Sequence, residues 1–192
     1  MLLIDFFVKI VNPSLPFNII YSNYRKKFNS IVKYSVKIYV IFLAVSFIWT
    51  SAIIITPVLA GMDGFWSELS VYLYTFFSST CHRLEERSFF ISGFPMAVCS
   101  RCASIYAAFL LSVILYPFIR GLENTKLPPL WILLLFSVLI LLDAVLDISG
   151  TLKNTFLTRG VSGFLVGFIL PFYLIPGTLN FANEIRNKYL KL

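Results

Sequence analysis

Apolar stretches separated by short polar segments dominate the pattern of this chain. Residues 38–60 contain no charge, and about 20 apolar residues suffice for a helix to cross the hydrocarbon core of a bilayer. Further apolar stretches follow at 103–119, 130–146 and 161–179. This pattern predicts an all-α fold, a polytopic integral membrane protein with about four transmembrane helices.

The ends of these stretches carry the residues that start or stop helices. The second stretch ends at Arg120-Gly121, and a glycine suits a helix end. If its helix begins one turn before residue 103, Cys99 and Cys102 share one face of the first turn. In the fourth stretch, Pro171 and Pro176 are expected to kink or end the helix.

Two segments are too short or too polar to span the membrane. Residues 67–79 are rich in Tyr and Phe, which is typical of a short interfacial or re-entrant helix. Residues 2–11 are candidates for a surface helix. We therefore expect a basic N-terminal segment (1–37), a four-helix membrane domain (38–179) that contains a Cys/His loop (80–102), and a basic tail (180–192).

Composition and charge support a membrane protein. Hydrophobic residues make up 58% of the chain and charged residues 13%, against about 25% charged in a soluble domain. The net charge of +7 comes from tails and loops without a basic stripe, so the expected partner is the lipid bilayer and not nucleic acid. The positive-inside rule places both basic termini in the cytoplasm, and a prokaryotic plasma membrane is the default location.

All three cysteines and the single histidine lie between residues 81 and 102. The pattern C-H-x16-C-x2-C is close to that of structural zinc sites, so Cys81, His82, Cys99 and Cys102 are predicted to bind zinc or another transition metal. Adjacent side chains diverge on regular backbone, so both Cys81 and His82 reach one ion only in an irregular loop. A three-ligand site completed by Asp143 or water is the alternative, and an open position would permit hydrolytic chemistry.

Other roles fit the same cysteines. A C-x-x-C pair at a helix start beside Arg101 is also typical of thiol-disulfide oxidoreductases, and at the outer face of a membrane Cys99 and Cys102 could pass electrons to a quinone. A structural disulfide and simple burial as small apolar residues are the remaining interpretations. Under these last two, the protein would be a non-enzymatic membrane scaffold.

With four spans, the cysteine loop lies on the same membrane face as Asp143, Asp147, Asn154 and Arg159. An acid inside a span needs a partner, and Arg159 is a candidate partner for Asp143. We favour an Arg-Asp network that supports the site over direct catalysis. If the site is catalytic, Asp143 is the supporting base, and Arg101 and Arg159 position an anionic substrate.

Arginines can also hold an anionic ligand at the membrane surface, because guanidinium groups bind phosphate and carboxylate. Candidates for contacts with a small anion or a lipid headgroup are Arg83, Arg87, Ser88 and Asn154. In the fourth stretch, Gly163-x-x-x-Gly167 predicts close packing of two helices.

The segment Cys81–Phe90, the motif Cys99-Ser-Arg-Cys102 and the later Asp143 and Asn154-x4-Arg159 pattern resemble the family of small predicted membrane proteins called domain of unknown function 2085. The resemblance covers roughly residues 75–170. It implies no established activity. It implies the following signature positions in this chain: Cys81, His82, Arg87, Ser88, Cys99, Arg101, Cys102, Asp143, Asn154 and Arg159.

Overall fold

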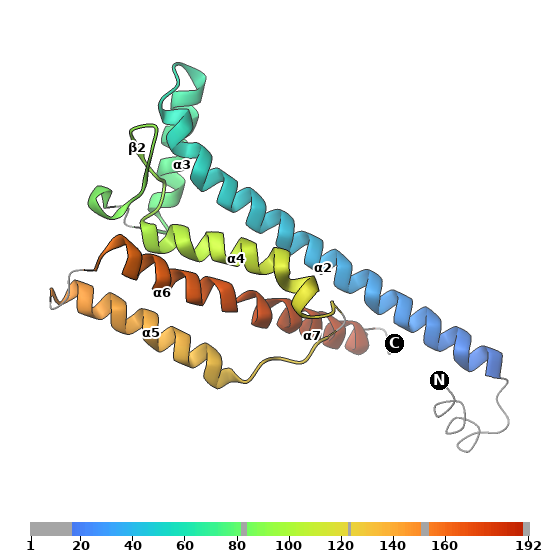
Figure 1. The fold of residues 1–192 in the computed structure, drawn as a ribbon. Coiled ribbons are helices and arrows are strands. Elements are labelled where there is room, and N and C mark those ends of the chain that lie inside the picture. The colour runs from blue at the N-terminus through green and yellow to red at the C-terminus, as the bar shows by residue number, and fades with distance from the viewer. Residues whose placement is uncertain (1–16, 82–83, 123, 151–153, 190–192) are drawn as a thin grey trace.

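The structure is a computed structural model, and it describes residues 17–81, 84–122, 124–150 and 154–189. Helices make up most of it (Figure 1): α2 (Phe17–Ala60), α3 (Phe65–Ser78), α4 (Ser100–Ile119), α5 (Leu130–Ile148), α6 (Phe156–Ile169) and α7 (Pro171–Tyr189). Four segments in the described part are long and apolar enough to cross a membrane: Tyr34–Ala60, Ser100–Ile119, Leu130–Asp147 and Phe156–Arg186. The predicted all-α membrane fold is confirmed.

Helix ends follow the local chemistry of the chain. Helix α4 begins at Ser100, as expected for the earlier of its two predicted starts. Helix α6 begins at Phe156, five residues before the predicted stretch, because the Thr155 hydroxyl accepts a hydrogen bond from the Thr158 N–H and caps the helix. Helix α6 ends before Pro171, as predicted, whereas Pro176 lies inside α7.

The short segment between α3 and α4 contains no α-helix. It contains the 3-10 helix η1 (Glu85–Arg87) and a two-stranded hairpin of β1 (Phe90–Ile91) and β2 (Phe94–Pro95). Ser92 and Gly93 both have positive φ, at 53° and 84°, which is the geometry of a tight hairpin turn. This hairpin was not predicted, and it lies at the end of the bundle where α2 ends and α4 begins (Figure 1).

Helices α4 and α6 approach each other at glycines. A Cβ placed on Gly163 would lie 2.5 Å from the carbonyl oxygen of Arg101, and one placed on Gly167 would overlap the carbonyl oxygen of Ile105. The predicted close packing through Gly163 and Gly167 is confirmed. Helix α6 lies between α4 and α5 (Figure 1), so α4 and α5 flank the same helix.

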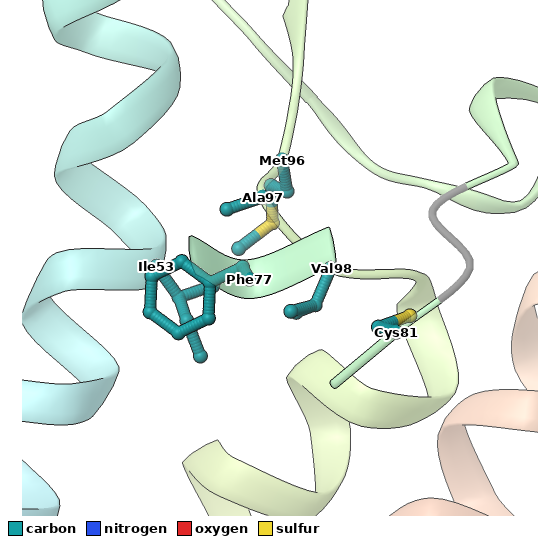
Figure 2. Packing of buried hydrophobic residues seen from close by; sticks show 6 residues of the cluster. All are labelled: Ile53, Phe77, Cys81, Met96, Ala97 and Val98. Carbon is teal, nitrogen blue, oxygen red and sulfur yellow. The ribbon is translucent and has the colours of Figure 1, made fainter. Parts of the chain in front are cut away.

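Two apolar clusters hold the bundle together at its two ends. Buried residues from α2, α3 and the hairpin segment form the first, around the start of α4 (Figure 2): Ile53, Phe77, Cys81, Met96, Ala97 and Val98. Tyr116, Phe172, Ile175 and Leu179 form the second, from α4 and α7. The first cluster fixes the segment between α3 and α4 against the membrane helices, and it includes one of the candidate metal ligands.

Candidate functional site

The three cysteines meet where α3 ends and α4 begins. Cys81 follows the last turn of α3, and its N–H donates to the Phe77 carbonyl at 3.0 Å. Cys99 is the N-cap residue of α4, and Cys102 lies in the first turn of that helix. The Cys99 N–H donates to the Cys81 sulfur at 3.3 Å, so the chain returns directly onto the first cysteine after the hairpin.

The three Sγ atoms all lie within 4.8 Å of one another. Thiolates that share a tetrahedral zinc ion with Zn–S bonds of 2.3 Å lie about 3.8 Å apart, whereas a disulfide needs a separation of about 2 Å. A shift of about 1 Å therefore suffices to form a shared metal site. Among the described residues this group contains three thiols and no carboxylate.

Two of the predicted site residues, His82 and Arg83, lie outside the described residues. The predicted role of His82 as a fourth metal ligand and that of Arg83 in anion binding therefore stay predictions.

The surroundings of the thiols are apolar. Cys81 is 7% exposed, and the partly buried side chains that pack with it include Trp49, Tyr106 and Ala103. The hydroxyl of Ser100 is fully buried beside Cys99 and has no hydrogen-bond partner in the described part of the chain. Exclusion of water from such a shell strengthens metal-ligand interactions.

Asp143, in α5, is surrounded by three donors from three segments. Its carboxylate accepts from the Arg101 guanidinium at 2.5 Å, the Asn154 amide at 2.7 Å and the Ser162 hydroxyl at 2.9 Å. The predicted pairing of Asp143 with Arg159 is wrong. Arg101 takes that place because the glycines of α6 let α4 approach closely, so that the Arg101 side chain reaches α5.

Asp147 lies one helical turn further along α5 and pairs with two arginines. Its carboxylate accepts from Arg87 at 3.1 Å and from Arg159 at 3.0 Å. The exposed fractions of the side chains are 38% for Arg87, 9% for Arg159 and 5% for Asp147. One carboxylate thus faces two guanidinium groups, and the Nε of Arg159 is buried without a partner in the described structure. The three side chains carry a formal surplus of one positive charge.

Two of the residues expected to contact an anion, Ser88 and Asn154, make hydrogen bonds to other groups of the protein. The buried hydroxyl of Ser88 donates to the Leu84 carbonyl at 3.0 Å. Asn154 donates through its side chain to Asp143 and through its backbone N–H to Asp147 at 3.3 Å. Of the described candidates for anion binding, Arg87 alone keeps a partly exposed charged group.

Those predicted site residues that the structure describes gather at one end of the bundle but form two clusters. Arg101 and Cys102 are adjacent in α4, so their side chains leave the helix about 100° apart. The thiols face α2 and α3, whereas Arg101 faces α5 and α6. Ser162 donates to Asp143 and so belongs to the second cluster, although it was not among the predicted site residues. Its spacing of three from Arg159 places both on one face of α6.

The part of the chain that contains these residues is similar to known proteins. A family model described as "Predicted membrane protein", domain of unknown function 2085, matches residues 81–173. An uncharacterized protein of Methanocaldococcus jannaschii is 36% identical over 143 residues, which is 73% of this chain and 92% of that protein. No solved structure matches the chain.

Proposed function

The chain belongs to the domain-of-unknown-function 2085 family of predicted membrane proteins, and we propose that it binds one zinc ion through Cys81, Cys99 and Cys102. The observation that carries this proposal is the gathering of three sulfur atoms within 4.8 Å of one another. They come from two segments separated by a 3-10 helix and a hairpin. His82 follows Cys81 in the chain and is the candidate for the fourth ligand.

The geometry favours a metal over a disulfide. A disulfide joins two sulfurs and leaves the third as a free thiol, whereas all three sulfurs are grouped here. Thiolate ligands select zinc and other thiophilic transition metals over magnesium and calcium. A C-x-x-C pair at the first turn of a helix presents two sulfurs to one ion, as in structural zinc sites.

The zinc ion has a structural role in this proposal. It would connect the end of α3 to the start of α4 and so fix the turn that carries Arg101. We do not assign a hydrolytic role, because the Asp143 carboxylate is held by Arg101, Asn154 and Ser162, and Arg101 leaves α4 on a different face from the thiol of Cys102.

The site is proposed to face the outside of the cell. The basic residues that precede the first span, Arg25, Lys26, Lys27, Lys33 and Lys37, place that end of α2 in the cytoplasm. The thiols belong to a cluster with Trp49, Ala52 and Ile53, in the half of this span that ends at Ala60. In this orientation, both termini of a plasma-membrane protein are cytoplasmic.

Metal analysis of the full-length protein, purified without chelators, tests the proposal. We expect about one zinc ion per chain, and a loss of most of it in Cys81→Ser, Cys99→Ser and Cys102→Ser. Ser79→Ala is the control, because Ser79 is an exposed residue two positions from Cys81 and should keep its zinc.

Another result would instead support thiol-disulfide chemistry. In that case the purified protein would contain no metal, and Cys99 and Cys102 would form a disulfide when a quinone is added. That disulfide would return to two thiols under a dithiol reductant. Zinc binding to wild type and to all three cysteine variants alike would also overturn the proposed ligand set.

A further inference from the structure

Helix α2 is longer than the membrane is thick, and its first part lies outside the bundle. The helix runs from Phe17 to Ala60, over 44 residues, which is about 66 Å at 1.5 Å per residue, against about 30 Å for the hydrocarbon core of a bilayer. The candidate span begins only at Tyr34. Residues 17–33 therefore form a helical arm, and Figure 1 shows this part of α2 extending past the ends of the other helices.

The face of α2 that packs on the bundle continues along the arm. Ile38, Tyr39 and Phe42 pack against the second apolar cluster, and Ser35, on the same face, is 3% exposed. At 100° per residue, the positions of the arm that lie on this face are all apolar or aromatic: Phe17, Ile20, Tyr21, Tyr24, Phe28, Ile31 and Val32. The arm thus carries an apolar face beyond the helices that cover this face within the bundle.

The other side of α2 is basic here. Two basic residues lie at the borders of the apolar face and three lie opposite it, within about 40° of one another around the helix: Arg25 and Lys27, then Lys26, Lys33 and Lys37. No acidic residue occurs between positions 6 and 62. Lys37 is exposed and takes part in none of the ion pairs of the described residues. A basic stripe was not expected from the sequence, and it is the helical backbone that brings these lysines onto one face.

The net positive charge of the protein lies at the same membrane face as the arm. In the four-span topology this face contains residues 1–37, 120–129 and 180–192, which include 11 of the 16 basic residues and three of the nine acidic residues. The acids at this face are therefore too few to neutralise the arm. A partner that covers the arm is expected to be anionic on one side and apolar on the other.

We propose that the arm binds the surface of the adjacent membrane leaflet, with its lysines on anionic phospholipid headgroups and its aromatic face toward the acyl chains. Lysines on one face and aromatic residues on the other are typical of helices that lie in the headgroup region. In the orientation proposed above, this leaflet is the cytoplasmic one, where anionic lipids attract basic segments next to a span. Figure 1 shows α2 running obliquely to α4, and a bend where the arm leaves the bundle would lay it on the leaflet.

A second copy of the chain is a poorer partner for this face. Each copy brings five basic residues and no acidic residue to the contact, so two arms side by side repel each other. The proposal does not depend on the zinc site, because the thiols pack near Trp49, Ala52 and Ile53, in the other half of the span.

Native mass spectrometry of the full-length protein in detergent tests the basic face. The protein is titrated with dioleoyl-phosphatidylglycerol and, separately, with dioleoyl-phosphatidylcholine. We expect wild type to retain the anionic lipid about tenfold more strongly, since one basic contact corresponds to about fivefold. A variant that combines Lys26→Gln, Lys33→Gln and Lys37→Gln should lose this preference.

The matched control removes the same charge from the same membrane face but outside the arm. It combines Arg186→Gln, Lys188→Gln and Lys191→Gln, and it should keep most of the preference. Circular dichroism and zinc content report whether each variant is folded.

Trypsin digestion of the full-length protein in nanodiscs tests whether the arm lies on the bilayer. The bonds after Arg25 and Lys27 should be cut several-fold more slowly when phosphatidylglycerol is added to phosphatidylcholine nanodiscs. Phe28→Ser, on the apolar face, should remove this protection, whereas Ile19→Ser, at a position of the basic face, should keep it. The bond after the exposed Lys126, in the loop between α4 and α5, is the internal reference for trypsin activity.

Four results would overturn the proposal. The first is equal retention of the two lipids by wild type. The second is an equal loss of preference in the arm variant and its control, which would mean that total charge and not the arm selects the lipid. The third is full displacement of the lipid by millimolar inorganic phosphate, which would mean that the lysines bind a free anion. The fourth is equally fast cleavage of the arm in both nanodiscs, which would leave its apolar face for a protein partner.

Discussion

Arg101 donates to Asp143 across 2.5 Å, and this pair ties the first turn of α4 to α5. Both side chains are largely buried, at 19% and 16% exposed. The same turn of α4 carries Cys102, and Cys99 caps it. The position of two proposed zinc ligands is therefore linked to an ion pair on the other side of the helix.

Removal of Arg101 should be costly. Arg101→Ala leaves the Asp143 carboxylate charged and mostly buried without its counterion, and such losses cost about 3 kcal/mol. Thermal unfolding in detergent, followed by circular dichroism, should show a clearly lower midpoint. Addition of Asp143→Asn should restore part of the loss, because the unpaired charge is then gone. An Arg101→Ala midpoint equal to that of an Arg186→Ala control would contradict this account.

The two arginines that share Asp147 should not be equivalent. Asp147→Asn leaves the buried guanidinium of Arg159 without an anion and is expected to cost about 3 kcal/mol. Arg87→Gln leaves Asp147 paired with Arg159 and should cost about 0.5 kcal/mol, as for a partly exposed ion pair. The thermal unfolding midpoints of the two variants, measured in the same way, should therefore differ, with that of Asp147→Asn the lower. An Arg87→Gln variant as unstable as Asp147→Asn would show that Arg159 alone does not satisfy the carboxylate.

The contact between α4 and α6 should tolerate no added methyl group at Gly167. Gly167→Ala would push its Cβ into the Ile105 carbonyl, and overpacking of this kind costs about 1–3 kcal/mol. Gly177→Ala is the matched control, since Gly177 lies in α7 with open space around it. That change should be neutral or slightly stabilising, because alanine favours helix. Equal midpoints for the two variants would argue against a close helix contact at Gly167.

Metal removal should destabilise the protein only when the thiols are intact. A ligand that binds the folded state alone stabilises it by an amount that grows with the logarithm of the ratio of its free concentration to its Kd. A strong zinc chelator is therefore expected to lower the thermal midpoint of wild type by several degrees, and added zinc should restore it. The Cys99→Ser variant should begin near the lower midpoint and show no response to the chelator. A chelator effect of equal size in both proteins would mean that another site binds the metal.

The membrane fold could be predicted from the sequence because it rests on the length and polarity of single segments. Residues 38–60 and 130–146 read as spans without any knowledge of their neighbours, and both lie inside the observed helices. The start of α6 was placed too late, because Thr155 caps the helix in front of the apolar run. The hairpin was missed because Ser92-Gly93 is a weaker turn signal than Asn-Gly.

The composition of the candidate site could also be predicted, but its pairing could not. The clustering of cysteines in one loop and the acid in a span were visible in the sequence. Whether Asp143 meets Arg101 or Arg159 depends on how closely α4 approaches α6, which is set by Gly163 and Gly167. The pattern of apolar and polar residues in a single segment carries no information on the distance between two helices. The arginine partner of each acid could therefore be identified only in the structure.

Most apolar side chains of helix α5 are exposed or half-buried in its span, Leu130–Asp147, whereas its two carboxylates are largely buried and paired with arginines. The order of the chain decides when those partners become available during synthesis. Arg87 and Arg101 precede α5, so both acids enter the membrane after an arginine partner has been made. Arg159, the second partner of Asp147, follows α5 in the chain. Each acid of α5 thus has one arginine partner that is synthesised before it, and a charge that would be costly alone in the membrane need not wait for α6.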